Sequence, residues 1–253
     1  MKLKVLGSSS RGNCYILEND HEALIIEAGF SFSRVKRALD HQHSKVVGCL
    51  ISHKHGDHAR FIAGFAKSGI NILASESVFS SNPMGRHGKM GIVIEPDTDY
   101  VLGEFTVSAF MLHHDVPCLG FLIDHPDSGL IAFISDTRLC DYVIPGLSHI
   151  IIECNYAKDI LEANIRSGRV HHTRGKRVLL THMELENCKK TLQLNDLSEV
   201  RNIVLAHLSP DNSDAVRFQD EIAAMTGKNV FVAGKDTTIN FGYLSREGRA
   251  AYL

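Results

Sequence analysis

Short apolar runs separated by polar turns make up most of the chain, and two of them run into a histidine. Residues 46–53 and 202–209 are continuous apolar stretches of strand length, which is typical of strands buried on both faces of a sheet. Apolar residues at helical spacing, followed by a glycine, predict a helix over 59–69. Further helices are expected at 33–39, 185–194 and 218–226, with another beginning near residue 159. Additional strands are expected at 2–6, 14–19, 21–29, 72–75, 92–95, 105–112, 119–124, 130–134, 149–152, 229–233 and 237–242.

Strands and helices alternate in both halves of the chain, without an internal repeat or a linker-like segment. A chain of 253 residues is long enough to bury a large core. We therefore expect an α/β fold in a single domain spanning residues 1–253, in preference to two small domains.

The composition is that of an ordinary globular protein and argues against a membrane. The sequence is 44% hydrophobic and 22% charged, has no apolar run of 18 residues, and lacks the apolar segment of a secretory signal at its N-terminus. Six cysteines occur without a C-x-x-C pair, which fits reduced thiols and excludes a zinc knuckle. We expect a cytoplasmic protein with no membrane partner.

The formal net charge of −2 bears on the kind of substrate. Proteins that hold long nucleic acids place many Lys and Arg side chains against phosphates. Any basic surface in this chain must be local, so a small nucleotide substrate is favoured over a nucleic-acid polymer.

Histidines cluster in one short segment. Of the 15 in the chain, three follow the first apolar run, at His53, His55 and His58, with Asp57 beside them. Residues 53 and 55 alternate as at the end of a strand, so both rings can reach one ion, while Asp57 and His58 can face a second. Imidazole and carboxylate suit zinc, with manganese or iron as alternatives. The competing interpretation, a histidine-rich surface loop without metal, is disfavoured by four ligand-type residues so close together.

The pattern H-x-H-x-D-H resembles that of the metallo-β-lactamase superfamily, and the resemblance extends over nearly the whole chain. It implies a four-layer αββα sandwich with two divalent metal ions, preferably Zn²⁺ and alternatively Mn²⁺, at one edge. Further ligands would follow later apolar strands, in LHHDVP, FISDT and LAHLS, and strand alternation in the first favours His114 over His113. The resemblance implies that His53, His55 and His114 hold one ion, that Asp57, His58 and His207 hold the other, and that Asp136 bridges the two.

Two of these positions carry further information. Asp136 stands where β-lactamases of the superfamily commonly have Cys, and an oxygen bridge suits phosphodiester cleavage better than antibiotic hydrolysis. His207 could instead be a buried histidine at the end of a strand, an interpretation that the family pattern disfavours.

Two further segments resemble ribonuclease Z and its relatives. Glu153 in IIIECNY matches a glutamate at a strand end, and His182 in THMELENC matches a histidine that sits over the scissile phosphate. A neighbouring carboxylate can keep a histidine charged so that it protonates the leaving oxygen. The resemblance therefore implies Glu153, His182 and the ligand Asp57 as catalytic residues. Alternatively, Glu153 is a buried, hydrogen-bonded glutamate and His182 begins a helix.

The roles of two polar segments stay open. Residues 166–177 form the most basic stretch and could contact the substrate phosphate, although such runs are more often solvated loops. The turn at 7–13 (GSSSRGN) could present backbone N–H groups to a phosphate, or it could be a plain structural turn.

The segments GSSSRGNCY, IIIECNY, THMELENC and VLAHLSPDNS together resemble a branch that contains YycJ-type exonucleases and anti-Pycsar phosphodiesterases. The compact chain, which is not basic, favours the second group. That resemblance implies a homodimer that hydrolyses cyclic mononucleotides, such as cyclic CMP and cyclic UMP, to linear nucleotides by attack of a metal-held hydroxide on phosphorus. The alternative is a nuclease acting on DNA or RNA. Within the branch, Glu27 stands where Asp is usual.

Two other classes of function are weaker alternatives. A thioester or lactone hydrolase of the same superfamily would use the metals without a Glu–His proton donor. A non-catalytic binding module would lack part of the ligand set, which is complete in this sequence.

Overall fold

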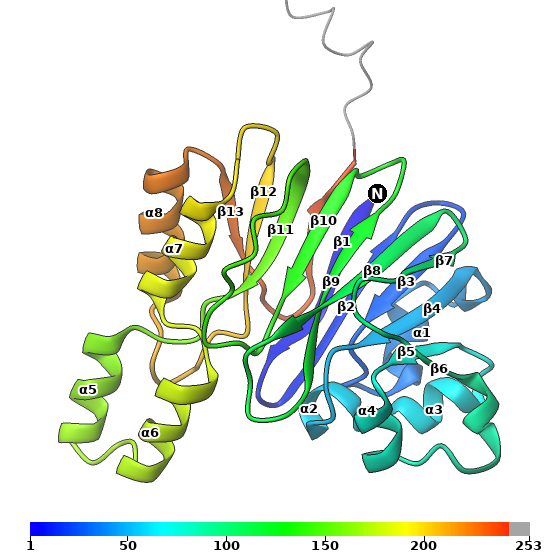
Figure 1. The fold of residues 1–253 in the computed structure, drawn as a ribbon, viewed down its shortest axis with the longest axis horizontal. Coiled ribbons are helices and arrows are strands. Elements are labelled where there is room, and N and C mark those ends of the chain that lie inside the picture. Colours follow the sequence, from blue (N-terminus) through cyan, green and yellow to red (C-terminus); the bar gives the residue numbers. More distant parts are fainter. Residues whose placement is uncertain (243–253) are drawn as a thin grey trace, which may run out of the picture.

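The computed structural model describes residues 1–242 and contains two seven-stranded mixed sheets that pack face to face, with helices on their outer faces (Figure 1). The four-layer sandwich expected from the sequence is confirmed. The first sheet has the order β14 (Thr237–Asn240), β1 (Lys2–Ser9), β2 (Gly12–Glu18), β3 (Ala23–Ile26), β4 (Val46–Ile51), β5 (Ile72–Ala74) and β6 (Gly91–Val93). The second has the order β13 (Asn229–Val232), β12 (Asn202–Ala206), β11 (Leu147–Glu153), β10 (Leu130–Ile134), β9 (Cys118–Asp124), β8 (Phe105–Leu112) and β7 (Asp99–Leu102).

Helices bury their apolar sides against the outer face of each sheet. Those on the first sheet are α1 (Phe32–Ala38), α2 (Gly56–Ala59), α3 (Ile62–Lys67) and α4 (Glu76–Ser81), together with the short 3₁₀ helices η1 (His43–Lys45) and η2 (Gly85–Met90). The second sheet is covered by α7 (Leu185–Leu194) and α8 (Ala215–Thr226). The remaining helices, α5 (Lys158–Arg166) and α6 (His172–Thr181), lie away from both sheets.

The alternation of side chains along the strands produces three apolar layers. On β2, Tyr15 and Leu17 point into the core between the sheets, whereas Cys14 and Ile16 point into the layer under the helices. Tyr15 meets Phe133 of the opposite sheet edge to face, with ring centroids 5.3 Å apart. Strands buried on both faces explain why the sequence shows continuous apolar runs rather than strict alternation.

Parallel pairing brings several strand ends to one edge of the sandwich. Strands β3 to β6 are parallel to one another, and so are β10 to β13. Their carboxyl ends therefore lie together within each sheet. In open α/β sheets this edge is where ligands bind.

Helices α5 and α6 form a hairpin, the α5–α6 lobe (residues 158–181), which projects at the lower left of Figure 1. Its own small apolar cluster includes Leu161, Ile165, Val170 and Val178. At the crossing of the two helices, a Cβ on Gly175 would lie only 2.5 Å from the Ile165 side chain. The absence of a side chain at position 175 therefore lets the helices approach closely.

Most of the predicted elements are present, with four differences. The helix expected over 59–69 is divided between α2 and α3, and the strands expected over 46–53 and 202–209 end at Ile51 and Ala206, each before its histidine. β7 and α4 were not predicted. The basic stretch, for which a solvated loop was the favoured interpretation, continues into helix α6. Within residues 1–242, no helix combines the length and apolar character needed to cross a bilayer.

Candidate metal centre

The loops after four strands converge at one edge of the sandwich. β4 leads into the segment with His53, β8 into His114, β10 into Asp136 and β12 into His207. Strands of both sheets thus deliver polar side chains to one place.

The first cluster contains the ring nitrogens of His53, His55 and His114. His55 Nδ1 lies 3.0 Å from His53 Nε2 and 3.3 Å from His114 Nε2. Tetrahedral zinc, with Zn–N bonds of about 2.0–2.1 Å, sets its nitrogen ligands about 3.3 Å apart. The spacing of the three rings therefore fits one such ion.

The second cluster contains Asp57, His58, Asp136 and His207. His58 Nε2 lies 3.4 Å from both Asp57 Oδ2 and Asp136 Oδ1, and His207 Nε2 lies 3.5 Å from Asp57 Oδ2. The other oxygen of Asp136, Oδ2, lies 4.0 Å from His53 Nε2 in the first cluster. Asp136 therefore turns one carboxylate oxygen toward each cluster, and all seven residues predicted as ligands are brought together.

The histidine rings are also held on the side away from the clusters. Ser52 Oγ lies 2.9 Å from His53 Nδ1, a Glu27 carboxylate oxygen lies 3.2 Å from His58 Nδ1, and the Thr181 carbonyl accepts from His114 Nδ1 at 2.9 Å. Such outer partners fix which ring nitrogen faces a metal and how the ring is oriented. Glu27, noted in the sequence as a departure from the usual Asp, has this supporting place beside His58.

Three residues at the site have backbones in the left-handed region. The φ angles are +69° at Glu27, +49° at Asp136 and +54° at His207. Each of these residues directly follows a strand or lies one residue beyond it, and none is glycine, so each conformation costs about 1–2 kcal/mol. The turn out of each strand aims the side chain at the clusters, and the packed sheets hold the chain in that conformation.

The charges of the second cluster require compensation. Burial opposes ionisation of Asp136, but His207 and His58 outweigh it and hold the pKa of this carboxyl well below its usual range. Burial likewise opposes the charged form of His207, yet Asp136 and the hydrogen bonds to Asp57 and Glu153 raise its pKa to about 10. The buried carboxylates are thus neutralised by protonated histidines. Divalent cations would supply the same positive charge, and their binding would release the histidine protons. The donor set fits two divalent cations, and imidazole with carboxylate suits Zn²⁺ or Mn²⁺.

Glu153 and His182 form an ion pair beside the second cluster. His182 Nδ1 lies 2.6 Å from Glu153 Oε1, while Glu153 Oε2 accepts from the backbone N–H groups of Thr137 at 2.8 Å and Met183 at 3.1 Å. The His182 ring stacks on His207 with centroids 5.3 Å apart. Burial opposes the charge on His182, but the Glu153 carboxylate outweighs it and raises the pKa of the imidazole. The pair therefore favours the protonated form of the His182 ring at the cluster.

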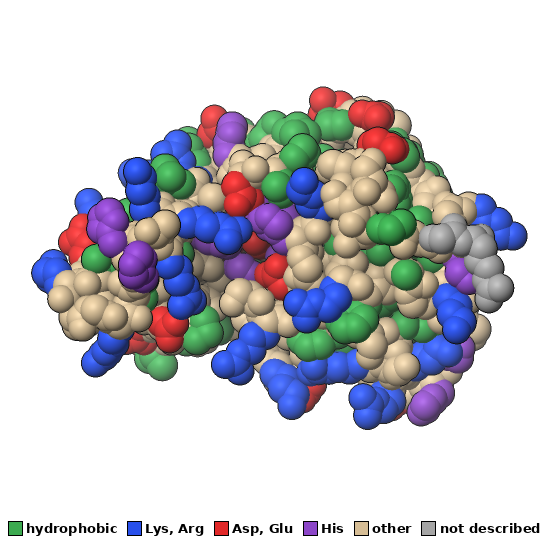
Figure 2. All heavy atoms as spheres, turned by 90° about the horizontal axis from the view of Figure 1, so that it is seen from below, with side chains coloured by type: hydrophobic (Ala, Val, Ile, Leu, Met, Phe, Trp, Pro, Cys, Tyr) green, Lys and Arg blue, Asp and Glu red, His purple; other side chains and the backbone are tan. Residues whose placement is uncertain are grey.

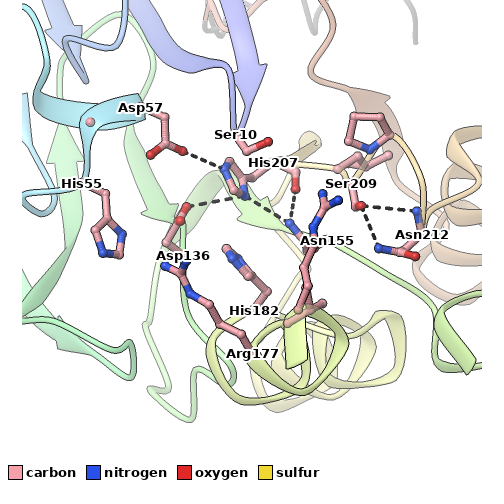
Figure 3. A pocket seen from close by; sticks show the side chains of 15 residues that line it. Ser10, His55, Asp57, Asp136, Asn155, Arg177, His182, His207, Ser209 and Asn212 are labelled. Carbon is pink, nitrogen blue, oxygen red and sulfur yellow. Dashed lines mark hydrogen bonds and ion pairs between the residues drawn. The ribbon is translucent and has the colours of Figure 1, made fainter. Parts of the chain in front are cut away.

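These groups open into a polar cavity of about 380 Å³, a size typical of small-ligand sites (Figure 3). Figure 3 shows His182 and Arg177 on one side of it and the segment with Ser209 and Asn212 on another. Lining residues with polar side chains are Ser10, His55, Asp57, Asp136, Asn155, Arg174, Arg177, His182, His207, Ser209 and Asn212. A phosphate ester fits this lining, because two arginines and several hydrogen-bond donors meet there.

A carboxylate that the sequence analysis did not single out links the first cluster to α6. Asp115 Oδ1 lies 3.3 Å from His55 Nε2 and 3.1 Å from His114 Nε2, and its other oxygen pairs with Arg177 at 3.1 Å. The contact joins residues 62 positions apart, so local sequence gives no sign of it.

The predicted catalytic residues Asp57, Glu153 and His182 all lie at the site, whereas His113 is exposed beside it. The polar turn at 7–13 contributes Ser10 to the cavity and Asn13 to the second cluster, where Asn13 Nδ2 lies 3.0 Å from His58 Nε2. Asn155, adjacent to the predicted Glu153 segment, donates to the His207 carbonyl at 2.7 Å. Asn155 could have been identified from its polar side chain and its position just after the end of β11.

Comparison with known proteins gives one family and several relatives. Residues 9–132 match the family described as the metallo-beta-lactamase superfamily. The chain is 25% identical over 227 residues to the exodeoxyribonuclease WalJ of Streptococcus pneumoniae serotype 2 (strain D39), covering 84% of this chain and 83% of that protein. It is 26% identical over 234 residues to the exodeoxyribonuclease YycJ of Bacillus anthracis, covering 84% of each.

The fold has a close structural counterpart. The metallo-beta-lactamase fold protein YhfI from Bacillus subtilis superimposes with a TM-score of 0.75 over 94% of this chain and 99% of that one, at 16% sequence identity. The architecture inferred from the sequence is thus shared with a solved structure along nearly its whole length.

Proposed function

Because the chain belongs to the metallo-beta-lactamase superfamily and is a metal-dependent hydrolase of that fold, we propose that it is a nuclease that cleaves phosphodiester bonds in DNA. The observation that carries the proposal is the Glu153–His182 ion pair beside the second cluster, with Arg174 and Arg177 lining the same cavity.

The ion pair favours phosphodiesters over the other substrates of such a fold. The leaving oxygen of a nucleotide ester is a poor leaving group that needs a proton, which a charged His182 can donate. A thioester leaves as a thiolate and needs no such donor. The arginines supply planar, charged hydrogen-bond donors that match phosphate oxygens.

Each side chain has a distinct part in this reaction. When bound, divalent cations supply the charge that activates water and stabilises the phosphoryl oxygens. His182 delivers its proton to the leaving oxygen, Glu153 keeps that ring charged and oriented, and Arg177 neutralises the phosphate from the side of α6. Asp57 and Asp136 are the carboxylates that would hold the cations, with the five histidine ligands.

Relatives and local charge support a DNA substrate over a cyclic mononucleotide. Both relatives described above are named exodeoxyribonucleases, and neither name refers to cyclic nucleotides. The sequence-based preference for a small nucleotide rested largely on the net charge of −2, which is an average over the whole chain. Exposed arginines gather beside the cavity in spite of that average.

The test is a comparison of substrates with purified protein loaded with Zn²⁺ or Mn²⁺. Linear single-stranded DNA, circular single-stranded DNA, a precursor tRNA, cyclic CMP and bis(p-nitrophenyl) phosphate are compared by kcat/KM. We expect linear DNA to be degraded and the circle to be spared, as an end-dependent nuclease requires. Asp136→Ala, prepared in parallel, excludes a contaminating nuclease. A kcat/KM for cyclic CMP well above that for DNA would instead place the chain among cyclic-nucleotide phosphodiesterases.

A further inference from the structure

We infer that the α5–α6 lobe is the surface that binds a nucleic-acid strand outside the cavity, with Arg174 and Arg177 at the point where the strand enters. The inference rests on the proposed function in one respect, namely that the substrate is a polymer. The lobe adds the surface of α5 and α6 to a cavity that otherwise accommodates one phosphate ester.

Charge is distributed very unevenly between the lobe and the rest of the chain. Residues 158–181 contain six Lys or Arg and two Asp or Glu, a formal charge of +4. The other 229 residues contain 21 Lys or Arg and 27 Asp or Glu, a formal charge of −6. A locally basic surface on an acidic protein draws a polyanion to that surface and away from the remainder.

Several cations of the lobe have no anionic partner inside the protein. Arg166, Arg169 and Lys176 are exposed, and none of them forms an ion pair with another residue in 1–242. One of the two acids of the lobe, Asp159, is already paired with Arg217 at 2.7 Å. The positive charge of the lobe is therefore available to a partner from solution.

The lobe is continuous with the cavity through α6. Arg174 and Arg177, one turn apart, both line the cavity, although their side chains are 61% and 62% exposed. Each makes one ion pair, at 3.7 Å to Asp211 and 3.1 Å to Asp115, which leaves further N–H donors of each guanidinium for phosphate. Figure 2 shows Lys and Arg side chains of the lobe, at the left, extending to the hollow where histidine and acidic side chains gather.

The lobe is also tied to the wall of the cavity. Asn164 Nδ2 donates to the Asp211 carbonyl at 2.7 Å and to Asn212 Oδ1 at 3.0 Å. The same segment contributes Ser209 and Asn212 to the cavity lining. A strand bound along the lobe is therefore held at a fixed position relative to the reacting phosphate.

The chemistry of the lobe predicts how it binds. Residues 158–181 contain no Phe, Tyr or Trp, so bases have no aromatic ring on which to stack. Contacts are then made to the phosphates, which makes binding steeply dependent on salt and nearly independent of base sequence.

The experiment measures binding of a labelled 20-nucleotide single strand by fluorescence anisotropy, in an Asp136→Ala background that does not cleave it. The lobe variant carries Arg166→Gln, Arg169→Gln and Lys176→Gln. The matched control carries the same loss of three charges at lysines outside the lobe, Lys2→Gln, Lys190→Gln and Lys228→Gln. Circular dichroism verifies that both variants fold.

We expect the lobe variant to bind about 10- to 100-fold more weakly at 0.1 M salt, with a log–log salt slope shallower by about 2, whereas the control changes by less than about threefold. Equal binding by the two variants would overturn the inference, and so would an unchanged salt slope. In a chain that retains Asp136, the lobe substitutions should lower kcat/KM on DNA at least about tenfold more than kcat/KM on bis(p-nitrophenyl) phosphate.

The outcomes separate the inference from the proposed function. Strong, lobe-dependent binding of DNA without any DNA cleavage supports the lobe and rejects the nuclease. Cleavage of DNA that is as efficient in the lobe variant as in the control supports the nuclease and rejects the lobe.

Discussion

The metal centre and the α5–α6 lobe lie side by side but are built on opposite principles. His53 and His58 are fully buried and Asp136 is 2% exposed, and the ligand histidines have outer partners that fix their orientation. The lobe consists of two short helices around a few apolar side chains, and its arginines project into solvent. The metal centre is fixed by the packing of both sheets, whereas the lobe depends on one helix crossing and a few polar contacts to the cavity wall.

The difference in burial indicates that the metal centre determines the chemistry, whereas the lobe determines which substrates are held. A substitution in the centre disturbs buried charges that depend on one another, so its effect is large and extends to every substrate. A substitution on the outer face of the lobe changes exposed charges only, so it alters which substrates are held while the chemistry is retained. The predictions below test that separation.

Asp136→Ala should have the largest effect, because it removes the carboxylate that faces both clusters. We expect kcat/KM for bis(p-nitrophenyl) phosphate to fall at least about 10⁴-fold, equivalent to about 5 kcal/mol. Elemental analysis should show bound metal falling below two ions per chain. Asp220→Ala, at an exposed acid on α8, serves as the control and should change neither quantity. Full metal content in Asp136→Ala would show that this carboxylate is not a ligand.

His182→Gln should separate proton donation from metal binding. We expect kcat/KM on DNA to fall about 10²- to 10³-fold, because the leaving alkoxide loses its proton donor. Hydrolysis of bis(p-nitrophenyl) phosphate should fall less than about tenfold, since nitrophenolate leaves without a proton. Metal content is measured alongside and should stay at the level of the unsubstituted chain. Equal losses on the two substrates would rule out the donor role.

Removal of metal should destabilise the centre and leave the lobe nearly unchanged. Ions present at about 100 times their Kd stabilise a fold by about 2.7 kcal/mol each, so removal of two ions should lower Tm by about 10–20 °C. Hydrogen exchange should accelerate in the segments after β10 and β12, which carry Asp136 and His207. Amides of α5 and α6 should exchange at similar rates with and without metal. Loss of protection across the lobe as well would show that the two regions form one cooperative unit.

Gly175→Val should have the smallest effect on the enzyme as a whole. The new side chain would meet Ile165 at the crossing of α5 and α6 and should cost the lobe about 1–3 kcal/mol. We expect faster exchange in the lobe, several-fold weaker DNA binding, and unchanged metal content. The matched control is Gly64→Val on α3, where an added Cβ has no neighbour within 4 Å. A loss of metal in Gly175→Val would contradict the independence of the two regions.

The sequence was most informative at positions where a residue type that binds metal directly follows an apolar strand. His53, His114, Asp136 and His207 each follow an apolar strand. Residue type and spacing singled out His53, and the resemblance to the superfamily added the other three. Glu153 and His182 were singled out by resemblance to ribonuclease Z and its relatives. The apolar runs predicted an α/β fold in one domain, and the resemblance to the superfamily supplied the four-layer architecture.

Contacts across the chain could not be predicted from local pattern. Helix α6 was not predicted, because its apolar face is short and is buried only against α5. Its many charged residues are typical of a solvated loop. The Asp115–Arg177 ion pair joins the loop after β8 to helix α6, far apart in sequence. The left-handed backbone conformations at Asp136 and His207 could not be predicted, because neither position has the glycine that usually indicates such a conformation. The preference for a small nucleotide rested on a net charge that averages the basic lobe with the acidic remainder, and it stays a prediction.

The second cluster unites Asp57 and His207, which are 150 positions apart in the chain. During synthesis on the ribosome, the early motif emerges long before β12 has formed and paired. A nascent polypeptide therefore cannot complete the second cluster until the segment with His207 has left the exit tunnel, whereas all ligands of the first cluster have emerged before it. Hydrolysis that needs the second ion therefore cannot begin before β12 has formed and paired.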